Sequence, residues 1–181
     1  MPTPGAALVP VMDAHTLAEF RRNKDEFFRG SRQSPLPHEL RHGFEGLKYF
    51  DLDEALDLEL ELHPEEPSPV EIGTSDGRVR TYFRAGRIEF DIDGELVRLT
   101  ALQTPGHPGY FLPFRDGTSG RETYGAGRYL DLEEPVDGML RVDFNLAYNP
   151  YCAYSDGYSC ALPPYENWLT VPIRAGEKTY K

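Results

Sequence analysis

Cysteine is scarce in this sequence, with only two residues of that type among 181. Two cysteines are too few to build the disulfide framework of a small secreted domain. No apolar run approaches the ~20 residues needed to cross a bilayer, and Met1–Gly5 lacks the basic segment of a signal peptide. We therefore expect a cytoplasmic protein that does not span a membrane.

Basic residues are also few. The sequence has 19 Lys and Arg against 30 Asp and Glu, which gives a net charge of −11. This charge repels phosphate backbones and anionic lipid head groups, so neither nucleic acid nor a membrane surface is an expected partner. A small-molecule ligand is the partner class that remains. The sequence does not determine the oligomeric state.

Glycine and proline are plentiful, with 17 and 16 residues, and they favour many tight turns over long helices. The length suits one domain with a sizeable core. We expect a single domain over residues 1–181, made of a flexible tail (1–12), an N-terminal helix (13–30) and a β domain (44–178).

The N-terminal helix is predicted from its end signals. Asp13 can cap the first turn, and Gly30, followed by Pro35, can end the helix. The apolar residues near one face are Leu17, Phe20, Phe27 and Phe28. This spacing is typical of a helix that covers a sheet, and the alternative is a helix that binds a partner.

Strands are predicted from an alternation of period two, which is clearest between Leu56 and Leu62. The proline-rich segment 64–69 is expected to break this strand, and Gly86 is expected to reverse the chain. A hairpin over residues 87–102 should turn at Asp93-Gly94, a pair that tolerates the positive φ angles of a type I′ turn.

The hairpin register places Phe90 opposite Val97 and Ile88 opposite Leu99 on one apolar face. Further strands are predicted at 110–114, 123–130, 140–147 and 168–173. About eight short strands with no helix between them favour an antiparallel barrel or sandwich over alternating βα units. The expected fold class is therefore mainly β with an N-terminal helix.

The string His38-Glu39-Leu40-Arg41-His42 has the spacing of a zinc-protease motif. That motif needs a sustained helix, yet Pro37 precedes it and Gly43 follows it. We favour a short turn with exposed histidines and predict no metal site, with His38 and His42 as the weak candidates.

Polar side chains gather between residues 115 and 128. The candidate ligand-binding residues there are Arg115, Asp116, Thr118, Ser119, Tyr124 and Arg128. The two arginines could grip a carboxylate or phosphate through paired hydrogen bonds, and the alternative is a buried Arg–Asp network that holds a hairpin. Gly125-x-Gly127 lacks the strand-to-helix context of a phosphate loop, and we predict no cofactor.

A second group lies on and after the strand predicted at 140–147. Its core-facing residues alternate with Asp143 and Asn145, which should project from the other face. If the aromatic loop from Tyr148 to Tyr158 folds across that face, a pocket forms beneath it. The candidate residues of this group are Asp143, Asn145, Tyr148 and Asn149.

Cys152 and Cys160 lie eight positions apart in the same aromatic loop and admit three interpretations. They are small packing groups or a local disulfide, or two ligands of a metal that needs two more, or Cys152 is a nucleophile. In the last case the base would be His63 or His107.

Several segments resemble the domain of unknown function 1684 family. They run from Phe111 to Asp131 and from Asp143 through Cys160 and Pro163-Pro164 to Lys178. The segments 34–37 and 44–50 look similar too, whereas the His38–His42 string does not look like part of the family pattern. The resemblance implies a bacterial or archaeal source, but this family has no agreed activity or catalytic residues to carry over.

The leading hypothesis is that a small polar or anionic ligand binds beneath the aromatic loop. The first alternative is a hydrolase that uses Cys152 or Asp143 as nucleophile or base. The second alternative is a structural or interaction domain without catalysis, in which these residues only hold loops in place. Whether the protein is an enzyme is left open at this point.

Overall fold

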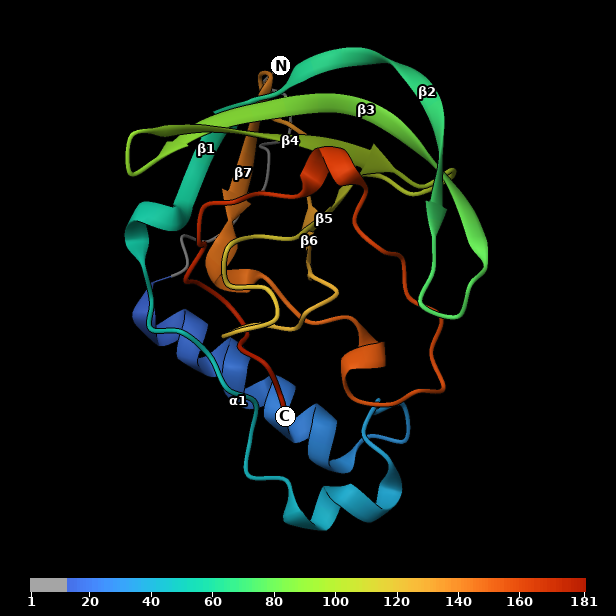
Figure 1. Ribbon diagram of the computed structural model, residues 1–181. Coiled ribbons are helices and arrows are strands. Elements are labelled where there is room, and N and C mark those ends of the chain that lie inside the picture. The colour runs from blue at the N-terminus through green and yellow to red at the C-terminus, as the bar shows by residue number, and fades with distance from the viewer. Residues whose placement is uncertain (1–12) are drawn as a thin grey trace, which may run out of the picture. The chain divides into compact units, whose positions relative to one another are not determined.

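The computed structural model describes residues 13–181, so the tail expected over residues 1–12 lies outside the described residues. The described chain forms two compact units, of which the first ends at Gly46 and the second spans Leu47–Lys181. Their elements are shown in Figure 1, and each unit is described by itself.

The first unit contains α1 (Ala14–Gly30) and the 3-10 helix η1 (His38–Gly43). The Asp13 side chain accepts a hydrogen bond from the Thr16 N–H at 2.8 Å, which confirms the predicted cap. Both predicted ends of the helix are therefore correct. Of the apolar residues expected on one face, Leu17 is buried and Phe20 is 41% exposed.

The second unit holds all seven strands of the described chain. They are β1 (Asp57–Glu61), β2 (His63–Gly73), β3 (Val79–Ile92), β4 (Glu95–Gln103), β5 (Tyr110–Phe114), β6 (Arg128–Leu132) and β7 (Met139–Asp143). One short 3-10 helix, η2 (Glu54–Leu56), precedes the first strand, and three follow the last: η3 (Phe144–Leu146), η4 (Tyr151–Ala153) and η5 (Tyr165–Asn167).

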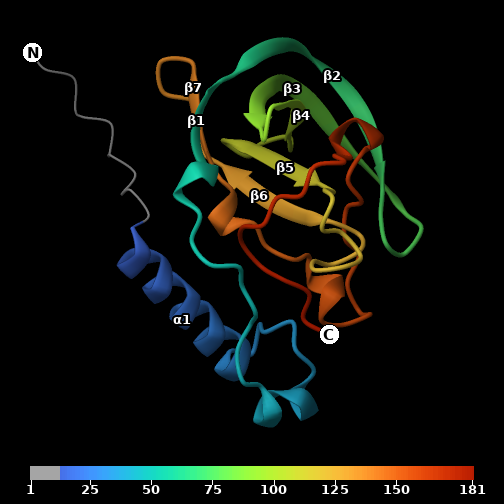
Figure 2. The ribbon, with the colours of Figure 1, turned by 60° about the vertical axis from the view of Figure 1, so that its left-hand side comes forward.

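The strands form two antiparallel sheets. One pairs β1 with β7, and the other has the order β2-β3-β4-β5-β6. Figure 2 shows the five strands one after another in this order. The prediction of a mainly β fold is confirmed. Within residues 13–181 the larger sheet stays open, since its order is linear and does not close into a barrel.

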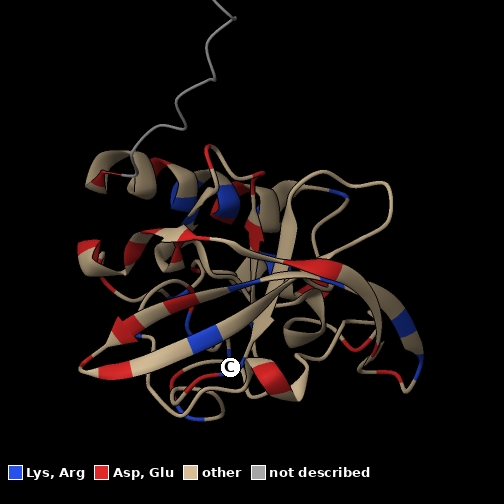
Figure 3. Cartoon of the chain, turned by 90° about the horizontal axis from the view of Figure 1, so that it is seen from above, with Lys and Arg blue, Asp and Glu red and all other residues tan. Residues whose placement is uncertain are grey.

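The predicted hairpin is β3 and β4. Phe90 pairs with Val97, and Ile88 pairs with Leu99, as expected. Asp93 and Gly94 both have positive φ, at 52° and 84°, which is the conformation that a type I′ turn requires. Figure 3 shows charged residues of both signs along the strands of the larger sheet.

The expected break at residues 64–69 and the reversal at Gly86 are both wrong. β2 continues through the prolines because it is an edge strand of the larger sheet, where proline is tolerated, and its register shifts between Pro64 and Ser68. Gly86 lies inside β3 at a second bulge. A Cβ there would come within 2.7 Å of the Leu62 side chain, so glycine permits a close approach between strands.

Three later strand predictions also need correction. The segment expected at 123–130 is a turn until Arg128, and the segment expected at 140–147 ends as a strand at Asp143. Residues 168–173 form no strand, and Trp168 makes only an isolated bridge to Arg115. Backbone hydrogen bonds still join this segment to residues 115–117, since the Leu169 N–H donates to the Arg115 carbonyl and the Gly117 N–H donates to the Val171 carbonyl, both at 2.8 Å.

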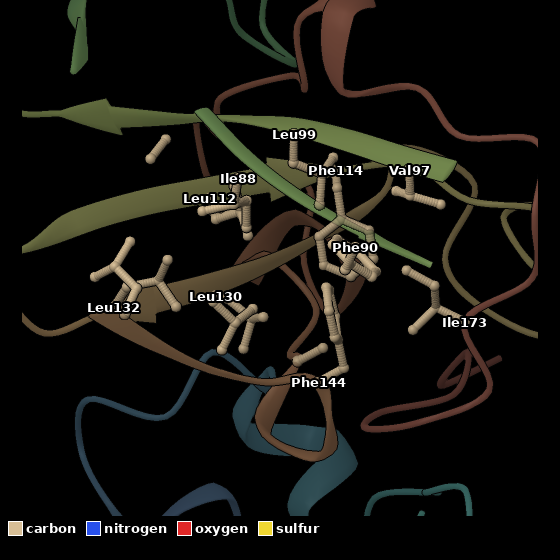
Figure 4. Packing of buried hydrophobic residues seen from close by; sticks show 14 of the residues in the cluster. Ile88, Phe90, Val97, Leu99, Leu112, Phe114, Leu130, Leu132, Phe144 and Ile173 are labelled. Carbon is tan, nitrogen blue, oxygen red and sulfur yellow. The ribbon is translucent and has the colours of Figure 1, made fainter. Parts of the chain in front are cut away.

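Both sheets contribute to one hydrophobic core. Figure 4 shows the buried residues of the larger sheet together with Phe144 and Ile173 from later segments. Leu140 and Val142 of β7 belong to the same cluster, and Leu58 and Leu60 of β1 pack against it. The alternation predicted in the first strand therefore points its leucines inward, and the arrangement is that of a sandwich.

The seam between β4 and β5 is short, because only Leu102 and Phe111 pair across it. The fully buried Asn167 side chain fills the rest of the gap. Its oxygen accepts from the Thr100 N–H at 2.8 Å, and its amide donates to the carbonyls of Thr100 and Pro113 at 2.9 Å. A side chain thus satisfies backbone groups that a neighbouring strand would otherwise satisfy.

Candidate functional site

Arg128 is the largest fully buried side chain of the described residues, and its donors bind main-chain oxygens. It donates to the carbonyls of Ile173 at 2.8 Å, Glu177 at 3.2 Å and Ala175, and it lies 3.5 Å from the Asp116 carboxylate. Burial lowers the pKa of Arg128, and the charge of Asp116 opposes that effect. The residue therefore ties β6 to the segment 173–177.

Asp116 is the other half of this network. Its carboxylate accepts from the Ile173 N–H at 2.6 Å and from the Thr118 hydroxyl at 2.8 Å. Ser119 donates to the same carboxylate at 3.3 Å. Four of the predicted ligand-binding residues, Arg128 included, are thus brought together, but their hydrogen bonds are used within the chain.

Arg115 points to a different place from Arg128. Its guanidinium lies 4.3 Å from the centroid of the Trp168 ring, and Trp168 stacks on Tyr165 with centroids 4.2 Å apart. The two rings are 41% and 81% exposed. The two arginines expected to grip one anion therefore do not share a site.

Asp143 and Asn145 are buried together beside η3. One Asp143 oxygen accepts from the Asn145 N–H at 3.0 Å and from the Asn145 amide at 2.8 Å. The Asn145 side chain also exchanges hydrogen bonds with the backbone of Asp53 at 2.9 Å. Burial raises the pKa of Asp143, whose second oxygen is buried without a hydrogen-bond partner.

Asn149 belongs to a separate buried group near the same loop. Its N–H donates to the Glu177 carboxylate at 2.7 Å, and its amide donates to the Lys178 carbonyl at 2.9 Å. The Tyr154 hydroxyl donates to the same carboxylate at 2.9 Å. These contacts hold the aromatic loop onto the segment 177–178.

Tyr148 is the predicted site residue that contacts Asp131 and Tyr129 on the outer face of the larger sheet. Its hydroxyl donates to the Asp131 carboxylate at 2.7 Å, and burial raises its pKa. Its ring is the end of an aromatic row across the outer face of the larger sheet. The row is Tyr82, Phe111, Tyr129 and Tyr148, with successive centroids 5.6, 4.8 and 5.7 Å apart.

A cleft of about 350 Å³ lies beside two rings of this row, Tyr82 and Phe111, and is lined by residues of β3, β5, β6 and the loop from β4 to β5. Its lining includes Tyr82, Phe111, His107, Thr104 and Asp131. The cleft thus combines aromatic faces with an imidazole and a carboxylate in one recess. We call it the Asp131 cleft.

The sequence reasoning did not select the main residues of the Asp131 cleft. Asp131 alternates with core residues Leu130 and Leu132, and that alternation could have placed it beside Tyr129 on the outer face. His107 lies in a turn before β5, where no periodic pattern marks which side chains face a recess.

Cys152 and Cys160 are free thiols. The Tyr124 hydroxyl lies 3.7 Å from Cys152 Sγ. Within residues 13–181 none of the hydrogen bonds of Cys152 involves a histidine, so the structure gives the nucleophile hypothesis no base from His63 or His107.

His38 and His42 are exposed on η1, with ring centroids 6.4 Å apart. The motif therefore forms a 3-10 helix instead of the sustained α-helix that a zinc protease uses. The part of the chain that is described holds no cluster of three or more His, Cys, Asp or Glu side chains suited to a metal ion.

A family model described as "Protein of unknown function (DUF1684)" matches residues 42–178. The chain belongs to this family. A related DUF1684-like structure is the solution NMR structure of an uncharacterised protein from Haloarcula marismortui, which is 44% identical and gives a TM-score of 0.71. The match covers 91% of this chain and 93% of the archaeal one.

No functionally curated protein matches the chain. The DUF1684 assignment confirms the resemblance drawn from the sequence, and it brings no activity with it. In the described part of this DUF1684 protein, none of the helices has the length and hydropathy of a membrane span.

Proposed function

We propose that the protein binds a small organic molecule in the Asp131 cleft. The observation that carries this proposal is the recess of about 350 Å³ in which ring faces, the His107 imidazole and the Asp131 carboxylate meet. Small-molecule sites combine apolar walls with a few polar groups in this way. The predicted groups around Arg128, Asn145 and Asn149 support the fold beneath it.

The chemistry of the cleft favours a particular kind of ligand. Tyr82 and Phe111 offer stacked rings to a flat or apolar body, and ring faces attract positive charge. The Asp131 carboxylate accepts hydrogen bonds and repels anions, while Tyr148 holds it in place. A polar ligand with an amino or ammonium group therefore fits better than the anionic ligand also considered from the sequence.

Matched probes test this proposal. Phenethylamine and 3-phenylpropionate have similar bodies and opposite charges, and each is titrated into ¹⁵N-labelled protein. The amine should shift the amide signals of His107 and Phe111 in a saturable way, and the carboxylate should shift them far less. Equal shifts from both probes, or shifts confined to other segments, would contradict the proposal.

Two variants separate charge from structure. Asp131→Asn keeps an oxygen that accepts from Tyr148 but removes the charge, and it should weaken amine binding by about tenfold or more. Glu61→Gln removes an exposed carboxylate from β1 in the other sheet and should leave binding unchanged. Equal affinity for all three proteins would show that Asp131 does not contact the probe.

A further inference from the structure

The two cysteines of the chain are brought together by the aromatic loop. The Cys152 N–H donates to Cys160 Sγ at 3.2 Å. Because the nitrogen and Cβ of Cys152 are bonded to the same Cα, the Cys160 sulfur lies next to the base of the Cys152 side chain. This is the kind of approach from which a disulfide can form without a large backbone movement.

Backbone hydrogen bonds fix the position of Cys160. Its N–H donates to the Ser75 hydroxyl at 3.1 Å, and its carbonyl accepts from the Ser75 N–H at 2.9 Å. The next residue, Ala161, forms a bridge with Thr74, and its carbonyl accepts from the Tyr129 hydroxyl. Cys160 is therefore anchored to the turn after β2 and to β6.

Cys152 is positioned by η4, in which the Ala153 N–H donates to the Pro150 carbonyl at 2.9 Å. Its side chain is partly exposed, whereas Cys160 is buried at 8% exposure. The pair thus combines a partly exposed cysteine with a buried one. That asymmetry is typical of thiol pairs in which one cysteine reacts and the other resolves.

We propose that Cys152 and Cys160 form a reactive dithiol that a hydroperoxide oxidises to an intramolecular disulfide. The Cys152 sulfur attacks the terminal peroxide oxygen and the O–O bond breaks, so that Cys152 becomes a sulfenic acid. The proton of its thiol passes to the other peroxide oxygen, which leaves as water or an alcohol. The Cys160 sulfur then attacks the Cys152 sulfur, the S–O bond breaks, and the departing hydroxide leaves as water with the proton of Cys160. The peroxide gains two electrons, and the two thiols lose them.

The surroundings assign the order of the two steps. Burial raises the pKa of the Cys160 thiol to about 11, so this sulfur stays protonated at neutral pH. Cys152 is therefore the sulfur that meets the peroxide first. The disulfide closes a loop that is already anchored at both ends, so the sheets keep their arrangement when it forms.

Mass spectrometry of the full chain tests the proposal. Reduced protein treated with one equivalent of hydrogen peroxide should lose the mass of two hydrogen atoms, lose both titratable thiols, and yield a peptide that links Cys152 to Cys160. Dithiothreitol should reverse all three changes. Retention of both thiols, or crosslinking only between chains, would overturn the proposal.

Single variants test the order of reaction. Cys160→Ser should accumulate a sulfenic acid at Cys152 that dimedone traps, because the resolving sulfur is gone. Cys152→Ser should react with peroxide at least about tenfold more slowly than wild type, since the remaining thiol is buried and protonated. Near-ultraviolet circular dichroism checks that each variant is folded. If a variant does not fold, the mass spectrometry of the oxidised wild-type protein decides the proposal. Faster oxidation of Cys152→Ser than of Cys160→Ser would contradict the assigned order.

Discussion

Arg128 and Asp116 form an ion pair whose side chains are 0% and 1% exposed, with 3.5 Å between nitrogen and oxygen. A buried pair is sustained only when its remaining hydrogen-bonding groups also find partners. Here the two terminal nitrogens of Arg128 donate to carbonyls of the segment 173–177, whereas Nε is buried without a hydrogen-bond partner. One arginine thus connects β6 to this segment. The pair is therefore expected to be structural.

Replacing Arg128 with Met should lower the free energy of unfolding by about 3–5 kcal/mol, because Asp116 and three carbonyls would lose a charged donor. Urea denaturation followed by circular dichroism measures this change. The control is Arg98→Met on β4. It removes an exposed ion pair with Glu89 of β3 and should change stability little. Similar losses for the two variants would contradict the role given to Arg128.

Asp143 should make the protein less stable as the pH rises. Burial raises its pKa above the ordinary value of 3.8, so the folded protein holds this proton more tightly than the unfolded chain does. Its contribution is therefore fully present below pH 3.8 and is lost as the pH rises through the folded-state pKa. Denaturation curves between pH 3 and pH 7 should show Asp143→Asn gaining stability relative to wild type across that window.

The contrasting carboxylate is Asp116, which lies 3.5 Å from Arg128 and accepts from the Ile173 N–H at 2.6 Å. Asp116→Asn should therefore be less stable than wild type at pH 7, while Asp143→Asn is equal or more stable. A loss of more than about 1 kcal/mol in Asp143→Asn at pH 7 would show that the charged form of Asp143 stabilises the fold.

Gly176 should not tolerate a side chain. Its φ is +78°, and a Cβ would come within 2.6 Å of the Ala147 carbonyl oxygen and 2.8 Å of that of Phe144. Gly176→Ala should cost about 2–4 kcal/mol, since backbone strain and overpacking add. Gly77 has a φ of +81° but open space around it, so Gly77→Ala isolates the strain and should cost about 1 kcal/mol. Thermal unfolding compares the two, and equal losses would mean that the contacts at Gly176 relax freely.

Features with a local cause were predicted from the sequence. The cap at Asp13 and the turn at Asp93-Gly94 depend on residues within four positions of each other, and both are confirmed. The bulge at Gly86 could not be predicted in this way, because it accommodates the side chain of Leu62, which lies between β1 and β2 and is distant in the sequence. The sequence pattern near Gly86 is that of an ordinary reversal.

The residues of the candidate site were likewise predicted only where their cause is local in the sequence. Its residues were selected by type and by nearness along the chain, and that criterion found Tyr148 but missed Asp131, to which Tyr148 donates. It also grouped Arg115 with Arg128, although one stacks on Trp168 and the other is buried. Arg128 is buried because the segment 173–177 packs next to it and supplies carbonyl acceptors. The residues near Arg128 in the sequence do not indicate the position of that segment.

The short seam between β4 and β5 makes the larger sheet depend on a segment that is not one of its strands. Because Asn167 supplies the missing hydrogen bonds, the backbone groups of Thr100 and Pro113 that it satisfies lose their partner if residues 165–169 detach. Opening of that segment should thus expose the Thr100 amide to solvent exchange together with its own amides, as one cooperative event. The hydrogen bonding between β4 and β5 therefore depends on a residue sixty-seven positions beyond Thr100 in the chain.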